Sequence, residues 1–311
     1  MKYTNPGFPQ IFEYQIFNDN VIGIDENHER SNTGYYLKLN DCDNCVFYKT
    51  VNLVDNFYIL FDMSITKATG STNFINDWVK VFDFYHDSDP NKNLQLCFKQ
   101  YLKDTFEVNI LTNSKIPLMS DPLYVKINEI NTFELHVIWS NTTTIEVYVN
   151  GRLVRNLLDT SLYKTGAINK VNRINFYCNY VLDVNACISN IIYNDSNKIG
   201  NERIHMLTTD YTHKIIANNI SGEFTINELL DNSMYKDITG FGLVTKVENE
   251  DTYKTEAVQH LDNQDLGSFK IESNQTGYNN AYVSTNTETK KPFSANEFSN
   301  KKIYIELSRK W

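Results

Sequence analysis

The chain contains little glycine and little proline, 12 and 6 of its 311 residues. This excludes collagen-like chains and Pro/Gly-rich disordered chains, since both need these residues in quantity. Asparagine, with 41 copies, is expected to supply many turns, because its short side chain tolerates left-handed backbone conformations. An AT-rich genome would also enrich asparagine whatever the fold, so the composition leaves both explanations open.

Cysteine is scarce, and its number is odd. The five are Cys42, Cys45, Cys97, Cys178 and Cys187. An odd number, in a chain whose first residues lack the apolar core of a signal peptide, argues against a disulfide framework. No stretch has the ~20 apolar residues that a membrane-spanning helix needs. We therefore expect a protein that is made in a host cytoplasm and has no membrane insertion.

Positive charge is in deficit. Lysine and arginine number 29 against 38 aspartates and glutamates, which gives a net charge of -9. Proteins that bind the phosphate backbone need the opposite sign, so we expect no nucleic-acid partner. Hydrophobic residues at 41% and charged residues at 22% are typical of a folded chain.

Alternating apolar and polar residues dominate the pattern. In Phe133–Trp139 every second residue is large and apolar, and Ile145–Val149 repeats the alternation after a short polar segment. This predicts a β-hairpin. Similar strands are expected at 34–39, 57–65, 78–85, 94–101, 106–111, 173–178, 186–193, 241–247, 269–272, 281–284 and 303–307. The core is expected to include Trp78, Phe82, Phe84 and Trp139.

Helical periodicity is nearly absent, so the predicted fold class is all-β, an antiparallel β-sandwich followed by a smaller C-terminal β domain. The polar segment 194–202 has the composition of a linker. We expect residues 1–198 to form the sandwich domain and residues 199–311 the C-terminal domain.

Four segments, in order, resemble concanavalin A-like and laminin-G-like domains. They are Phe57–Ile65, Phe133–Trp139, Val147–Gly151 and Ala186–Asp195. The resemblance implies a jelly roll made of two packed sheets.

The layout of the whole chain resembles bacteriophage structural proteins of the tail or head decoration, which join such a domain to a small C-terminal β domain. Segments 231–235, 240–244 and 302–307 carry this second resemblance. It implies a virion location, other virion proteins and cell-surface glycan as partners, and a homo-oligomer within a particle.

Catalytic motifs are not found. Glucanases of this fold carry Glu-x-Asp-x-x-Glu on one strand, where two carboxylates act on the glycosidic bond. The nearest segment here, Asp83–Asp87, lacks both glutamates. The six histidines are scattered along the sequence. We therefore predict that the chain is not an enzyme, and keep a glycoside hydrolase as an alternative only because the fold hosts such enzymes.

Metal and ligand sites are weakly marked. Cys42 and Cys45 have the spacing of half a zinc site, without a second pair. A calcium-loop-like start gives Asp87, Asp89 and Asn91 as candidate ligands, but the glycine and glutamate of an EF-hand are missing. No cofactor is expected apart from calcium at these three residues. Tyrosines on outward faces or loops can stack on sugars or anchor a partner, and the candidates are Tyr85, Tyr148, Tyr163 and Tyr180.

The leading interpretation is a non-catalytic virion structural protein that acts in assembly or host-surface contact. The alternative is a carbohydrate-binding, lectin-like module.

Overall fold

The computed structural model describes part of the chain, and the regular structure of these residues consists of β-strands without any helix. These residues are 2–5, 22–24, 32, 35–38, 45–68, 70–86, 93–112, 115–139, 143–159, 170–178, 183–200, 202, 204, 221–225, 241–249, 252, 254–261, 263–283 and 302–310. Within these ranges nothing has the helical length and hydropathy needed to cross a membrane. The chain divides into two compact units, Met1–Met206 and Leu207–Trp311. The domain boundary predicted near residue 198 stays a prediction.

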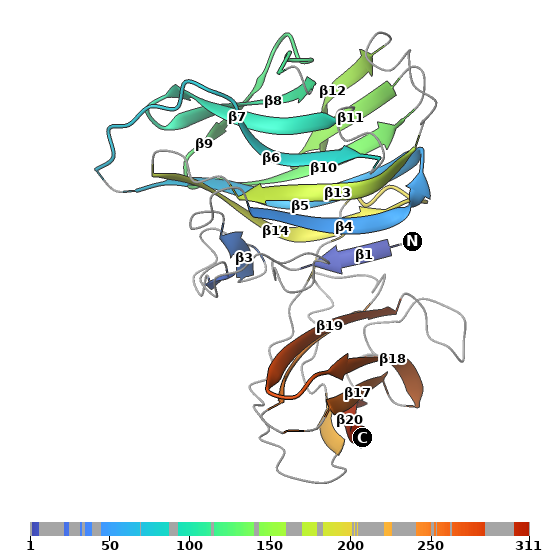
Figure 1. Ribbon diagram of the computed structural model, residues 1–311. Helices are drawn as coiled ribbons and strands as arrows, with labels where there is room; N and C mark the ends of the chain where they lie inside the picture. Colours follow the sequence, from blue (N-terminus) through green and yellow to red (C-terminus); the bar gives the residue numbers. More distant parts are fainter. Residues whose placement is uncertain are drawn as a thin grey trace. The chain divides into compact units, whose positions relative to one another are not determined.

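The first unit is a sandwich of two antiparallel sheets (Figure 1). The six-stranded sheet has the order β4 (Cys45–Val54), β13 (Val171–Cys178), β6 (Val79–Tyr85), β7 (Leu94–Leu102), β8 (Thr105–Thr112) and β9 (Leu123–Lys126). The eight-stranded sheet has the order β12 (Arg152–Asp159), β11 (Thr143–Val149), β10 (Ile130–Ile138), β5 (Asn56–Lys67), β14 (Val184–Asn194), β3 (Tyr35–Lys38) and β2 (Ile22–Ile24), and β1 (Lys2–Asn5) also pairs with β14.

The core lies between the two sheets and is rich in phenylalanine. Phe61 of β5 meets Phe176 of β13 edge to face, with ring centroids 5.4 Å apart. Phe84 of β6 meets Trp139 in the same way at 5.5 Å. Aromatic pairs of this geometry add stability beyond the area that they bury. Trp78, which was expected in this core, is instead partly exposed.

The predicted antiparallel sandwich of the jelly-roll class is confirmed. Its central hairpin is β10–β11, in which Phe133 pairs with Val149 and Leu135 with Val147. Alternation fixes this register, because a slip of one residue would turn the whole apolar set toward solvent.

The second unit is also antiparallel. Its four-stranded sheet has the order β15 (Ser221–Thr225), β20 (Lys302–Lys310), β17 (Lys254–Leu261) and β18 (Gln264–Ile271), while β16 (Phe241–Asn249) pairs with β19 (Gln275–Val283).

Candidate functional site

An irregularity in β6 places two charged residues on one side of the six-stranded sheet. Lys80 pairs with Cys97 of β7, and Asp83 pairs with Gln95, but the register shifts between these two pairs. Cys97 and Gln95 are two residues apart, so they share a face, and their partners must share it as well. The extra residue, Val81, thus brings Lys80 and Asp83 to the same side, as a β-bulge does. We call this side, opposite the core, the outer face.

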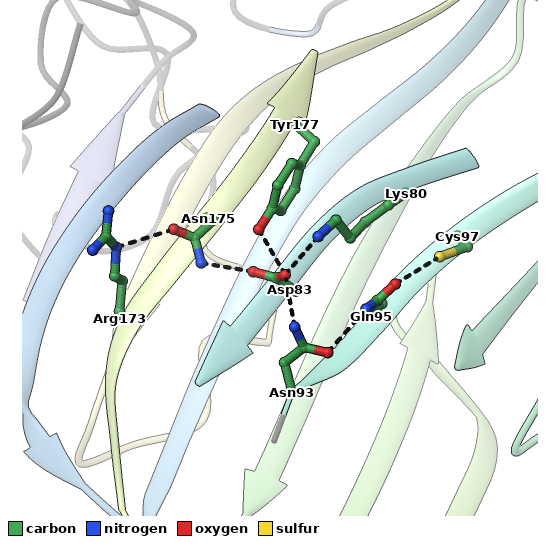
Figure 2. A network of polar contacts seen from close by, with 8 residues as sticks. All are labelled: Lys80, Asp83, Asn93, Gln95, Cys97, Arg173, Asn175 and Tyr177. Carbon is green, nitrogen blue, oxygen red and sulfur yellow. Dashed lines mark hydrogen bonds and ion pairs between the residues drawn. The ribbon is translucent and has the colours of Figure 1, made fainter. Parts of the chain in front are cut away.

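Asp83 is the centre of a hydrogen-bond network on the outer face. Its side chain is fully buried. Asn175 Nδ2 donates to Oδ1 at 2.6 Å, and the Tyr177 hydroxyl donates to Oδ2 at 2.7 Å. Lys80 Nζ lies 3.0 Å from Oδ2, and Asn93 Nδ2 lies 3.4 Å from it. Figure 2 shows these side chains pointing toward Asp83 from β13, from β6 and, for Asn93, from the residue just before β7. All four contacts are donors, an arrangement that fits the ionised carboxylate.

A second layer of contacts fixes the amides around Asp83. Gln95 Nε2 donates to Asn93 Oδ1 at 2.9 Å, and Arg173 Nε donates to Asn175 Oδ1 at 3.3 Å. Cys97 Sγ lies 3.9 Å from Gln95 Oε1, and burial raises the pKa of its thiol to about 12, so Cys97 stays protonated. These contacts orient both amide groups, and the network continues across three strands (Figure 2).

Burial dominates the electrostatics of this site. It raises the pKa of the Asp83 carboxyl, against the opposing effects of Lys80 and of the hydrogen bonds from Tyr177 and Asn175. Burial and then the Asp83 charge also raise the pKa of the Tyr177 phenol. At neutral pH Tyr177 therefore keeps its proton and donates it in a hydrogen bond to Asp83. The Lys80 ammonium lies 3.6 Å from the centre of the Tyr177 ring, where the ring face attracts a cation.

This arrangement is a costly way to stabilise a sheet. A buried charge with its partners is often no more stabilising than apolar residues of the same volume. Buried carboxylates with strong charge partners are instead typical of functional sites, where they hold other groups in place. The network gives Lys80, Tyr177 and Arg173 fixed positions on the outer face.

The tyrosines predicted from the sequence do not form one site. Tyr85 lies on the outer face, with its ring centre 5.9 Å from the Arg173 guanidinium. Tyr148 belongs to β11 of the other sheet, where its hydroxyl donates to Glu146 at 2.9 Å and Lys198 Nζ lies 3.7 Å from its ring centre. Because these two sheets present opposite outer sides of the sandwich, one ligand cannot bind both residues.

The remaining predicted site residues lie outside the described residues. They are Tyr163, Tyr180, Asp87, Asp89 and Asn91. Their assigned roles stay predictions. Among the side chains that the structure describes, no group of three or more His, Cys, Asp or Glu is placed to hold a metal ion.

The sequence analysis missed Lys80, Asn93, Asn175 and Tyr177. A signal for two of them was present: β13 alternates Arg173, Asn175 and Tyr177 with the core residues Ile174 and Phe176. A polar stripe on a strand with one buried face marks the side opposite the core.

Comparisons with known proteins give relatives by fold only. No protein-family model matches the chain, and no curated protein does. Among solved structures, an alginate lyase in complex with an alginate tetrasaccharide matches with 9% identity and a TM-score of 0.41, over 62% of this chain and 96% of that one. An endo-beta-1,4-glucuronan lyase from the fungus Trichoderma reesei matches with 10% identity and a TM-score of 0.41, over 62% and 95%. The binding domain of botulinum neurotoxin serotype G matches with 12% identity and a TM-score of 0.37, over 57% and 44%.

Two predictions are wrong in the light of these matches. The virion structural protein is contradicted, because the matches just described are two polysaccharide lyases and a toxin binding domain. The prediction that the chain is not an enzyme is contradicted as well. It relied on a missing glucanase motif along one strand, whereas some matched proteins are lyases, and side chains that meet on a sheet can come from several strands. The predicted location and partners are untested.

Proposed function

We propose that the outer face of the six-stranded sheet binds carbohydrate. The observation that carries this proposal is the Asp83 network, which holds Lys80, Tyr177 and Asn175 in fixed positions on a sheet side opposite the core. Groups that are ordered before binding lose less conformational entropy when a ligand arrives.

The chemistry of this face matches that of a sugar. Pyranose hydroxyls both donate and accept hydrogen bonds, and the face presents the ammonium of Lys80 and the guanidinium of Arg173, both on partly exposed side chains. Sugar rings also have apolar C–H faces, which pack on aromatic rings such as Tyr85. A few well-placed polar groups beside aromatic rings are typical of small-molecule sites. This proposal takes up the lectin-like alternative of the sequence analysis.

A glycan array tests the proposal, with Lys80→Met as the variant. Lys80 is 25% exposed and lies on the side opposite the core, but it also pairs with the buried Asp83, so the urea denaturation midpoint of the variant is measured together with its binding. We expect the wild-type protein to bind a defined group of glycans, and the variant to bind them about tenfold more weakly, because one charge-assisted hydrogen bond is lost.

The matched control for Lys80→Met is Lys254→Met in the second unit, where Lys254 pairs with Glu272. The control is expected to bind like the wild type. An array without any bound glycan, or equal binding by wild type and Lys80→Met, would contradict the proposal.

A further inference from the structure

Two exposed tyrosines lie at the far edge of the same outer face. Tyr101 and Tyr124 are both 51% exposed, and their ring centroids are 4.8 Å apart. Tyr124 of β9 pairs with Glu107 of β8, which pairs in turn with Lys99 of β7. Lys99 shares a face with Cys97 and hence with Asp83, so the tyrosine pair and the Asp83 network are on one side of the sheet.

The two features are too far apart for one sugar. β6, β7, β8 and β9 are successive neighbours in the sheet. With strands about 4.8 Å apart, three steps across the sheet amount to ~14 Å. The register of Asp83 is at Gln95 of β7 and that of Tyr124 is at Lys99, so four residues add ~13 Å along the strand and the two features lie ~20 Å apart. Between them Lys99 forms an ion pair with Glu107 at 3.1 Å, and its Nζ lies 4.5 Å from the ring centre of the partly exposed Trp78.

We propose that Tyr101 and Tyr124 form an aromatic subsite for a polysaccharide chain that runs across the strands from the Asp83 network to β9. This inference rests on the proposed carbohydrate binding. It specifies the class of carbohydrate that the outer face would bind, which is a linear chain of β-linked pyranoses. Such rings place C–H groups on both faces, and these faces stack on aromatic rings. Exposed aromatic side chains that lie together on one surface indicate a binding site, whereas single exposed ones are normal on any protein.

The charge of the intervening face supports a sugar chain rather than a highly charged polymer. Lys99 is paired with Glu107 and Lys80 with Asp83, so neighbouring charges largely cancel between the two features. A neutral or weakly charged ligand meets little net field there, and its hydroxyls can bond to either sign of charge.

The test compares Tyr124→Ala with the wild type on hexasaccharides and disaccharides of β-linked glucose, N-acetylglucosamine and mannose, by isothermal titration. The wild type should bind at least one hexasaccharide more tightly than its disaccharide. The variant should bind that hexasaccharide about tenfold more weakly, with disaccharide binding unchanged. Tyr124→Phe, which keeps the ring, should restore the wild-type affinity. Leu153→Ala, at a 52% exposed apolar residue of the other sheet, is the control.

The possible failures are distinct. If the wild type binds hexasaccharide and disaccharide equally, or if Tyr124→Ala keeps the preference for the longer chain, the aromatic subsite is refuted while carbohydrate binding stands. If the wild type binds no member of the panel, the subsite and the proposed function both fail for these sugars. If Tyr124→Ala changes only self-association measured by sedimentation, the face is a protein interface and the subsite is refuted.

Discussion

Replacing Asp83 with alanine is expected to lower the free energy of unfolding of the sandwich by about 3–5 kcal/mol, the usual cost of removing one partner of a buried ion pair. Asp83 is fully buried, and four donors converge on it. Without the carboxylate, Asn175 Nδ2 and the Tyr177 hydroxyl lose their acceptor at a place where little water can replace it. Urea denaturation followed by tryptophan fluorescence, to which the core residue Trp139 contributes, measures the loss.

Two further variants separate this effect from a general loss of charge. Asp83→Asn keeps the shape but offers one acceptor oxygen to several donors, so an intermediate loss of about 1–3 kcal/mol is expected. Asp121→Ala removes a 79% exposed carboxylate that pairs with Arg155, and its effect should stay within about 0.5 kcal/mol. An unchanged denaturation midpoint for Asp83→Ala would show that the network does not hold the outer face together.

The fold could be predicted because its signal is local and repeated. In β10 and β11 every second side chain is apolar. The apolar residues of the two strands lie opposite one another in the sheet, as in the Phe133–Val149 and Leu135–Val147 pairs. Burial of one face sets such a register, whatever the rest of the chain does. The same reasoning failed for Trp78, which is the first residue before a strand, where alternation no longer decides which side a residue faces.

The site could not be predicted in the same way, because its residues come together only through strand pairing. Asn175 and Asp83 are 92 residues apart in sequence, yet their side chains are 2.6 Å apart. Lys80 reaches the outer face through the register shift in β6, and strict alternation would place it on the opposite side from Asp83. A motif search along one strand therefore misses both groups.

The tyrosines predicted to bind a ligand also show that sequence alone does not tell which residues come together in the fold. Tyr85 and Tyr148 have similar local patterns, each being the polar-facing residue of an alternating strand. Which sheet each strand joins is a property of the topology, and it places them on opposite outer sides. Only the structure distinguishes the tyrosine beside the Asp83 network from the one that bonds to Glu146.

The second large effect concerns binding by the outer face. Tyr85 and Arg173 come from neighbouring strands and lie beside the network, with 5.9 Å between ring centre and guanidinium. Removing both in Tyr85→Ala/Arg173→Ala takes away one stacking ring and one charged donor. Together these are expected to weaken binding of a glycan about a hundredfold, which corresponds to about 2.7 kcal/mol. Both side chains are partly exposed, so the sandwich should keep its stability.

The most direct measurement is therefore isothermal titration of the glycan that binds best on the array, with three proteins side by side: wild type, Tyr85→Ala/Arg173→Ala, and Tyr148→Ala. Binding through the outer face of the six-stranded sheet predicts a loss of about a hundredfold for the double variant and wild-type affinity for Tyr148→Ala. Wild-type affinity in the double variant, together with lost binding in Tyr148→Ala, would place the ligand on the eight-stranded sheet and contradict the account.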